Sequence, residues 1–457
     1  MRFKIELFFG KLIIWFINRI APHKGTSFPG KFINRLDEKF LGQFRGMDFD
    51  KVVFITGTNG KSTMTNLLYH IMKKNNYDVV ANLEGANQKC GVATTLMKNA
   101  TFSGRVKGEY FLFEIDERSL HQIYRHIPAK HMVITNIQKD QVQRNGDPDF
   151  IVRHLESVIN NDMILYLNND EPRSKYFEEK SRWVHYFGVE KNDFSYHKTG
   201  QWDISMPCPR CARPIEFAFL NIDNVGQFSC PFCGFASEEN PKTYISQIDF
   251  GLGRFVVDEQ NFDMPYHVPF MLYNYAGAIA VAKNLGLSIE SIASAFSTFI
   301  NIGGRIETLR YGEKDIKYIR IKQENPETLQ SALDSVAADK TEKVFVLGLY
   351  EIVDFVPHYT NTFYAYDCDI SKLIESNVKK YICFSEYVCY DTALRFLHEG
   401  VEPEKVMILP TKDAREIFQA ALEQECDNIY LITWLKTFQE IKNFVRQDNK
   451  QAQEEEQ

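Results

Sequence analysis

Short apolar runs alternate with longer stretches of helical periodicity along most of the chain. Residues 62–74 are predicted to form a helix, because Leu67, Leu68, Ile71 and Met72 fall on one face. Buried strands are predicted at 51–55, 111–113, 132–134 and 163–167. Strands that alternate with helices imply a parallel sheet covered on both faces. The pattern therefore predicts an α/β domain over residues 49–308.

The alternation is interrupted once and then restarts. Residues 200–245 have a loop-like composition and are predicted to be an insertion into the first domain. Further strands are predicted at 344–347, 380–384, 406–408 and 429–432. Helical stretches separate these strands, so a second, smaller α/β domain is expected over 309–446. The polar tail, 447–457, is expected to be disordered.

The first 48 residues are predicted to form an N-terminal helical segment, which leads into the first α/β domain. Their longest apolar run, Leu12 to Ile17, is far shorter than the roughly 18–20 residues that span a bilayer. No small-residue cleavage site follows it, so we expect a cytoplasmic protein without a secretory signal. An amphipathic helix packed on the protein is the favoured interpretation, and an interfacial helix resting on a membrane is the alternative.

Composition limits the class of function. The 457 residues include 53 Lys and Arg against 60 Asp and Glu, which gives a net charge of −7. A protein that coats nucleic acid would normally be basic, so no nucleic-acid partner is expected. The hydrophobic share of 44% also excludes disorder as the dominant state.

Four of the nine cysteines form two Cys-x-x-Cys pairs. They are Cys208 with Cys211 and Cys230 with Cys233, and 18 residues separate the pairs. In a cytosolic chain this spacing favours metal binding over disulfides. Four thiolates complete the tetrahedral shell of Zn²⁺ and leave no position for a substrate water. We therefore predict a structural zinc site that stabilises the inserted loop.

The strongest chemical signal is the stretch Thr56-Gly57-Thr58-Asn59-Gly60-Lys61-Ser62, between a predicted strand and a predicted helix. Backbone N–H groups of such a loop can hold phosphate oxygens, while Lys61 neutralises them and the Ser62 hydroxyl can reach Mg²⁺. The strict pattern for this loop has a glycine where Ile55 stands, so only the tighter form of the motif is met. The sequence predicts an ATP site.

The chain resembles the Mur ligase superfamily, ATP-dependent enzymes that join a carboxylate to an amine. Glu114 matches the family's magnesium-binding glutamate, Asn274 its adenine-contacting asparagine, and Arg305 the arginine that ends the central domain. Asn325-Pro326 resembles the pair that opens the C-terminal ligase domain. The resemblance implies a nucleotide site made of Gly57, Thr58, Asn59, Gly60, Lys61, Ser62, Thr63, Asn274 and Arg305, with Ser62 and Glu114 on Mg²⁺.

Within this superfamily the chain is most similar to MurT-type proteins. The lead before the phosphate loop is too short for the UDP-binding domain of other Mur ligases, and residues 82–87 and 91–95 resemble the MurT-type segment. MurT-type proteins also carry a four-cysteine zinc ribbon in the central domain. The resemblance runs from Gly10 to about Val445 and is weaker after residue 310.

The resemblance implies amidation of the D-isoglutamate α-carboxyl in the stem peptide of lipid II. ATP would phosphorylate the carboxylate, and ammonia would come from a GatD-type glutamine amidotransferase partner. Lys61 and Glu114 would act in the phosphoryl transfer, and Asp354 or Asp367 would complete the partner's glutaminase triad. The resemblance also implies an enzyme that works at the inner face of the membrane.

Several positions depart from the family patterns. Gln141 stands where classical Mur ligases have a metal-binding histidine, and Gln143 replaces the aspartate expected two residues later. Asn361 falls where the first aspartate of the MurT C-terminal segment is expected. Two alternatives therefore stay open: an amide ligase like folylpolyglutamate synthase, and a nucleotide-binding regulatory or scaffold paralogue without amidation activity.

Overall fold

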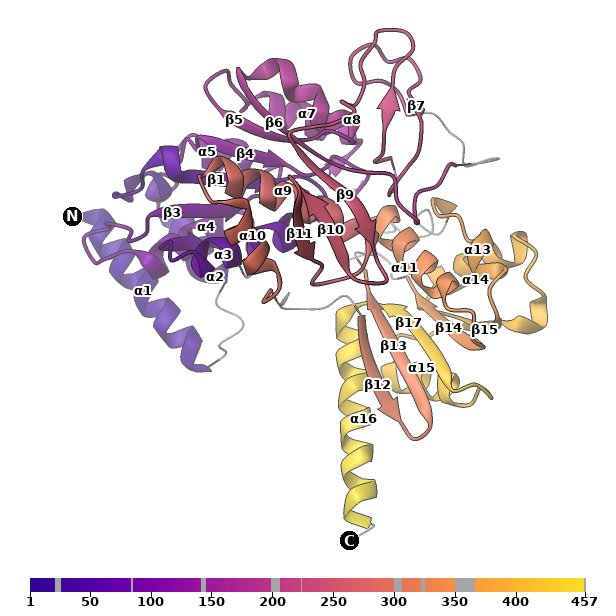
Figure 1. Cartoon of the computed structure of the whole chain (residues 1–457). Helices are drawn as coiled ribbons and strands as arrows, with labels where there is room; N and C mark the ends of the chain where they lie inside the picture. The colour runs from indigo at the N-terminus through magenta and orange to yellow at the C-terminus, as the bar shows by residue number, and fades with distance from the viewer. Residues whose placement is uncertain are drawn as a thin grey trace. The chain divides into compact units, whose positions relative to one another are not determined.

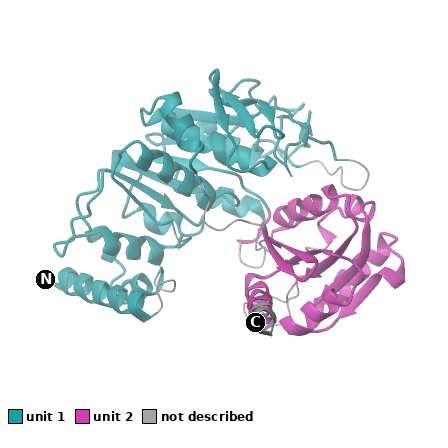
Figure 2. Ribbon diagram, turned by 60° about the horizontal axis from the view of Figure 1, so that its bottom comes forward, with its two compact units in different colours: residues 1–138, 147–301 teal, residues 139–146, 302–457 magenta. Residues whose placement is uncertain are grey.

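The computed structural model of the chain divides into two compact units (Figures 1 and 2). Unit 1 contains residues 1–138 and 147–301, and unit 2 contains residues 139–146 and 302–457. The structure describes residues 1–20, 26–83, 85–140, 145–198, 206–222, 224–299, 306–321, 325–349 and 366–455. The domain boundaries expected from the sequence stay predictions.

Unit 1 is built on a nine-stranded sheet with the strand order β11-β10-β9-β6-β5-β4-β1-β3-β2. Its strands are β1 (Val52–Thr56), β2 (Val79–Ala81), β3 (Tyr110–Glu114), β4 (His131–Ile134), β5 (Ile164–Asn168), β6 (Trp183–Val189), β9 (Thr243–Asp249), β10 (Arg254–Val257) and β11 (Gln260–Asp263). Neighbouring strands pair in parallel along the part of the sheet with the order β9-β6-β5-β4-β1-β3-β2. At the other edge, β10 pairs antiparallel with β9, and β11 pairs antiparallel with β10. The four strands predicted in this region, 51–55, 111–113, 132–134 and 163–167, are confirmed.

Helices cover this sheet. They are α1 (Arg2–Ile20), α2 (Phe28–Leu36), α3 (Lys61–Lys74), α4 (Lys89–Asn99), α5 (Leu120–Tyr124), α7 (Pro148–Glu156), α8 (Pro172–Lys175), α9 (Pro269–Asn284) and α10 (Ile289–Phe296), with short 3-10 turns at Phe40–Gln43, Phe49–Lys51 and Tyr176–Lys180. One apolar core lies around α3 and α9, and a second lies around α1, α4 and α7. The predicted helix over 62–74 is confirmed as α3.

The inserted loop forms a small two-stranded ribbon, β7 (Glu216–Phe217) paired antiparallel with β8 (Phe228–Ser229). Its own core consists of Ile215, Phe228 and Phe235 together with two cysteines, Cys208 and Cys230. This core is too small to hold the loop without a further constraint.

Unit 2 has a six-stranded sheet with the order β12-β13-β17-β14-β15-β16, in which only β12 is antiparallel. The strands are β12 (Ile306–Tyr311), β13 (Lys314–Arg320), β14 (Lys343–Gly348), β15 (Val378–Phe384), β16 (Val406–Leu409) and β17 (Asn428–Thr433). The helices are α11 (Pro326–Ala338), α13 (Ser371–Ile374), α14 (Val388–His398), α15 (Ala414–Leu422) and α16 (Leu435–Glu455), with a 3-10 turn at Pro403–Lys405. All four strands predicted here are confirmed.

Two local features of unit 2 bear on the sequence-based expectations. Asn325 caps α11, since its side chain accepts a hydrogen bond from the Thr328 backbone N–H at 2.9 Å, and Pro326 occupies the first turn. At the other end, α16 continues to Glu455, whereas a disordered tail was expected from residue 447. Residues 435–455 contain neither Gly nor Pro, so nothing in the sequence ends this helix earlier.

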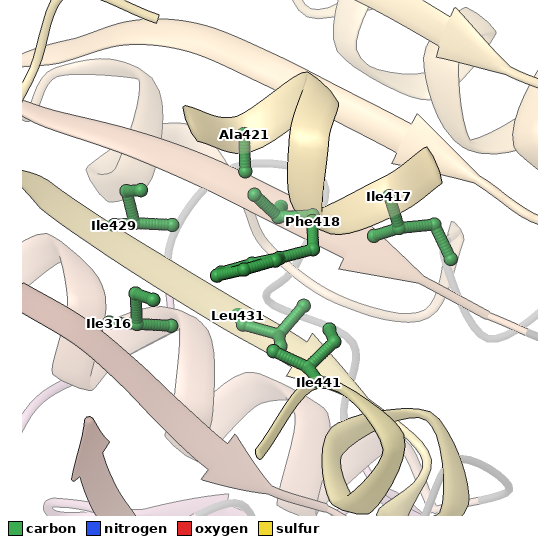
Figure 3. Close-up of a pocket in the computed structure, with 8 residues that line it drawn as sticks. Ile316, Ile417, Phe418, Ala421, Ile429, Leu431 and Ile441 are labelled. Carbon is green, nitrogen blue, oxygen red and sulfur yellow. The ribbon is translucent and has the colours of Figure 1, made fainter. Parts of the chain in front are cut away.

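Unit 2 also contains a small gap in its packing between α15 and the sheet (Figure 3). Apolar side chains line it, among them Ile316, Phe418 and Ile441. None of the lining residues offers a polar side chain to a ligand. We therefore interpret it as a packing defect rather than a binding site.

Candidate nucleotide site and metal centre

The phosphate loop joins β1 to α3, and its glycines are required by the geometry. Gly57 and Gly60 have φ values of +122° and +85°, which side chains with a Cβ rarely adopt. A Cβ at Gly57 would lie 2.2 Å from the Thr135 hydroxyl oxygen, and a Cβ at Gly60 would lie 2.0 Å from the Asn274 side-chain oxygen. The backbone therefore approaches its neighbours so closely that only glycine fits.

The segment after β4 holds the loop in shape through hydrogen bonds. The Thr58 backbone N–H donates to the Asn136 carbonyl at 2.8 Å, and the Asn59 N–H donates to the Asn136 side-chain oxygen at 2.9 Å. The Thr135 hydroxyl donates to the Asn59 carbonyl at 2.7 Å, and the Gln138 N–H donates to the Thr58 hydroxyl at 2.9 Å. The sequence predicted the loop but not these supporting roles of the 135–138 segment.

Lys61 turns back onto its own loop. Its ammonium group donates to the carbonyls of Gly57 and Thr58 and forms an ion pair with Glu117 at 3.2 Å. Both charged side chains are 9% exposed. Glu117 is therefore part of the site, although the sequence singled out only Glu114 in this stretch. The pair depends on the fold, because 56 residues separate the partners.

Glu114, at the end of β3, offers a buried oxygen that suits a cation. One carboxylate oxygen accepts a hydrogen bond from the Asn87 side chain at 3.0 Å. The other is buried and has no hydrogen-bond partner among the described residues. Ser62, in the first turn of α3, is exposed. Mg²⁺ takes oxygen ligands, so the Glu114 carboxylate and the Ser62 hydroxyl have the donor chemistry that the predicted ion needs.

Asn274 lies on α9, which packs against α3 and brings the asparagine to Gly60. The neighbouring Tyr273 is tied to the centre of the unit, because its hydroxyl donates to the Asp170 carboxylate at 3.0 Å. Asp170 also accepts from the Val189 N–H at 2.9 Å. Burial of this carboxyl group raises the pKa of Asp170 to about 6. The position predicted to contact adenine thus lies beside the phosphate loop.

The four predicted zinc ligands meet in the inserted ribbon. The Sγ atoms of Cys208, Cys211, Cys230 and Cys233 all lie within 4.8 Å of one another. The distances are 3.7 Å between Cys208 and Cys233 and 3.6 Å between Cys211 and Cys230. A tetrahedral Zn²⁺ with Zn–S bonds of about 2.3 Å places its sulfur ligands roughly 3.8 Å apart, so the four thiols fit this ion.

The two cysteine pairs have the same local geometry. The Cys208 carbonyl accepts from the Ala212 N–H at 2.8 Å, and the Cys230 carbonyl accepts from the Gly234 N–H at 3.0 Å. Both pairs therefore present their thiols from a tight turn. The ribbon is also joined to the larger core, because Arg210 donates to the Glu178 carboxylate at 2.6 Å.

A second connection runs from the ribbon to the nucleotide site. The Asn221 side chain donates to the Tyr273 hydroxyl at 3.0 Å and to the Val189 carbonyl at 3.2 Å. Tyr273 directly precedes Asn274 on α9. The zinc ribbon is thus hydrogen-bonded to the residue that directly precedes the candidate adenine contact on α9.

The remaining predicted residues belong to the other part of the chain. In unit 2, Asp367 accepts a hydrogen bond from the Lys139 ammonium at 2.8 Å. The Lys139 carbonyl in turn accepts from the Asn325 side chain at 3.2 Å. Arg305 and Asp354 lie outside the described residues, as do Gln141, Gln143 and Asn361.

Comparison with known proteins agrees with this arrangement. Residues 55–206 match the family model of the Mur ligase middle domain, and residues 323–436 match that of the MurT ligase C-terminal domain. A curated relative is the lipid II isoglutaminyl synthase (glutamine-hydrolyzing) subunit MurT of Staphylococcus aureus strain COL. It is 29% identical over 368 residues, which are 80% of this chain and 81% of the relative.

Solved structures show the same fold. A pseudomurein peptide ligase type C from Methanothermus fervidus matches with a TM-score of 0.66 at 18% identity, over 89% of this chain and 81% of that chain. MurF ligase from Thermotoga maritima, solved in complex with ADP, matches with a TM-score of 0.56 at 15% identity, over 88% of this chain and 80% of that chain.

Sequence and fold therefore agree on one family. The order of the two matched domains supports this assignment. The similarity to the Staphylococcus aureus relative, which extends over most of the chain, supports it as well. This chain therefore combines a Mur ligase middle domain with a MurT ligase C-terminal domain, which supports a carbon–nitrogen ligase.

Proposed function

We propose that this protein amidates the α-carboxyl group of D-isoglutamate in the stem peptide of lipid II, with ATP as the source of energy. The observation that carries the proposal is the pairing of a preformed phosphate loop with the buried, unpartnered oxygen of Glu114 in unit 1. The similarity to the MurT C-terminal domain and to a MurT subunit supports the choice of substrate.

The proposed reaction has two steps. A carboxylate oxygen of the substrate attacks the γ-phosphorus, and ADP leaves as an acyl phosphate forms. Ammonia then attacks the acyl carbon, phosphate leaves, and the nitrogen loses a proton. Magnesium would offset charge on the phosphate oxygens. Ser62 and Glu114 would hold the ion, while Lys61 would exchange Glu117 for the phosphoryl oxygens.

The ammonia is proposed to come from a GatD-type glutamine amidotransferase subunit. A glutaminase of this kind needs a reactive thiolate, and all nine cysteines of this chain are described. Four of them fit zinc, Cys368, Cys383, Cys389 and Cys426 are buried, and Cys90 is half-buried on α4. Burial raises the pKa of the Cys383 thiol, which disfavours the thiolate. A second chain is the better source of ammonia.

This chain is proposed to supply an aspartate to the partner's glutaminase triad. Asp354 and Asp367 are the two candidates. Asp367 forms an ion pair with Lys139 at 2.8 Å. The variants Asp354→Asn and Asp367→Asn, each tested in the assembled complex, should distinguish the two candidates. Only substitution of the true triad residue should lower the rate of glutamine hydrolysis. If neither variant lowers it, the partner completes its own triad.

The nucleotide chemistry is tested by Lys61→Ala in the purified complex with the amidotransferase subunit. Mass spectrometry measures the rate at which lipid II is amidated in the presence of glutamine and ATP. This rate should fall by at least about a thousandfold, which is the loss that phosphoryl-transfer enzymes show when a cation that stabilises the transition state is removed. Lys73→Ala, an exposed lysine of the same helix, is the matched control and should keep full activity.

Persisting amidation in the Lys61→Ala complex would contradict the proposed mechanism. A wild-type complex that binds ATP and its partner but amidates nothing would instead identify a scaffold protein. Transfer of an amino acid rather than ammonia would identify an amide ligase of the folylpolyglutamate-synthase kind.

We further propose that the reaction takes place on the cytoplasmic side of the membrane, where a lipid-linked substrate is accessible. The four-cysteine site would hold a structural Zn²⁺ that has no part in the reaction, because four thiolates leave no open coordination position. No described helix is long and apolar enough to cross a membrane.

A further inference from the structure

The N-terminal helix α1 has two apolar faces, and only one of them is covered. Leu7, Gly10 and Ile14 are buried against unit 1. Gly10 is needed there, because a Cβ would lie 2.3 Å from the Met97 sulfur on α4. The opposite face exposes large apolar side chains whose exposed fractions range from 46% to 67%: Phe8, Phe9, Leu12, Trp15, Phe16 and Ile20. Such a stripe is unusual on a soluble domain.

Neighbouring residues extend the exposed area. On α2, which packs against α1 and α4, Phe28, Phe32 and Leu36 repeat every four residues and are 44–56% exposed. Phe102, 64% exposed, lies with its ring centroid 6.3 Å from that of Phe8. We call the exposed apolar side chains of α1 and α2, together with Phe102, the N-terminal apolar surface.

Positive charge surrounds this surface. Residues 1–36 contain seven Lys and Arg but one acidic residue, whereas the whole chain has 53 basic and 60 acidic residues. The one acidic residue, Glu6, is buried and paired with Arg2 at 2.8 Å. The segment is therefore strongly basic in an acidic protein. A binding surface of complementary charge would be anionic.

The basic groups lie beside the aromatic ones. Arg19 stacks 4.4 Å over the Trp15 ring, and the Lys11 ammonium lies 5.6 Å over the Phe102 ring. Lys4, Lys31 and Arg35 are exposed. Aromatic and aliphatic side chains flanked by Lys and Arg are typical of helices that lie in a bilayer interface, with the apolar face among the acyl chains. Nucleic acid would meet the basic groups but leave the apolar stripe in water.

We propose that α1 and α2 form a membrane-docking surface that inserts the N-terminal apolar surface into bilayers rich in anionic phospholipids. Anionic headgroups contact the surrounding Lys and Arg side chains, and the apolar stripe leaves water. The proposal does not depend on the proposed amidation, because it concerns the surface alone and its test measures binding rather than catalysis.

The test is flotation of the full chain with vesicles, one set of phosphatidylcholine alone and one with equal parts of phosphatidylglycerol. Wild-type protein should float with the anionic vesicles, and added salt should weaken the binding. The double variant Phe8→Ser/Phe16→Ser should bind at least about tenfold more weakly, because two apolar side chains no longer enter the bilayer. Trp183→Ser/Leu252→Ser removes two even more exposed apolar side chains elsewhere and should bind like wild type.

A second pair of variants tests the charge. Lys4→Gln/Lys31→Gln leaves the apolar stripe intact and should reduce binding to the anionic vesicles severalfold, as loss of two surface cations does. All variants change exposed side chains, and thermal melting should show unchanged stability.

Three results would overturn the proposal. They are a wild-type protein that stays unbound, a Phe8→Ser/Phe16→Ser protein that floats as well as wild type, and equal binding to both kinds of vesicle. A wild-type dimer that this variant converts to monomer, with no vesicle binding, would assign the surface to a second copy of the chain instead.

Discussion

At the scale of single residues, His131 shows how burial fixes a protonation state. Its Nδ1 lies 2.9 Å from the Tyr166 hydroxyl, and its Nε2 lies 3.1 Å from the Asp50 carbonyl. The Asn284 side chain donates to the same hydroxyl at 2.7 Å. A neutral imidazole satisfies all of these groups if Nε2 carries the proton and the tyrosine donates to Nδ1. Burial accordingly lowers the pKa of His131 to about 4.

This shift predicts a pH dependence of stability. An unfolded histidine titrates near 6.5, so between pH 6.5 and 4 the unfolded chain binds a proton that the folded chain refuses. The stability that His131 contributes is therefore complete above pH 6.5 and is lost as the pH falls. Urea unfolding should show that His131→Asn costs about 2 kcal/mol less at pH 5 than at pH 7. His197→Asn, at an exposed histidine, is the matched control.

The nucleotide site shows which residues a sequence can predict. Gly57, Gly60 and Lys61 follow a motif whose spacing is local, so their roles could be predicted without a structure. Glu117 could not be assigned, because its partner Lys61 is distant in sequence and meets it only after β1 and β3 pair in parallel. The supporting hydrogen bonds from Asn136 arise in the same way.

At the scale of elements, buried strands were the easiest to predict. All five residues of β1 and of β3 are buried, and such apolar runs are visible in the sequence. The prediction missed β6, whose residues change from exposed to buried along its length, and β2, which has three residues. It also missed the antiparallel extension by β10 and β11, two strands of only four residues each.

The zinc ribbon is an element whose fold should depend on its ion. Cys230→Ser removes one of four ligands, so metal analysis should find close to one zinc per chain in wild type and far less in the variant. Because Asn221 joins the ribbon to Tyr273, we also expect ATP to bind about fivefold more weakly, a coupling of about 1 kcal/mol. Cys90→Ser, outside the cluster, is the control. Full zinc content in Cys230→Ser would contradict the assigned ligands.

At the scale of the whole molecule, each unit has its own apolar cores. The clusters around α3 and around α4 contain residues of unit 1 alone, and the two clusters on either side of the second sheet contain residues of unit 2 alone. Units with separate cores can unfold as separate cooperative transitions.

Calorimetry of Phe418→Ala tests this separation. Phe418 is buried in unit 2 and its ring packs 5.2 Å from that of Tyr311, so the truncation should cost about 3–5 kcal/mol. Only the transition of unit 2 should move to lower temperature, while that of unit 1 stays in place. Ile408→Ala, at a side chain that is 41% exposed, should have little effect. A single transition that shifts as a whole would show that the units unfold together.

The ion pair of Lys61 has a consequence for how the nucleotide binds. A lysine in water must lose its hydration shell before it can contact a phosphate, and that desolvation weakens binding. Here the ammonium group is already buried among two carbonyls and Glu117. Folding has therefore already desolvated this ammonium group. When the phosphate binds, Lys61 exchanges one anionic partner for another, and no water has to leave the ammonium group.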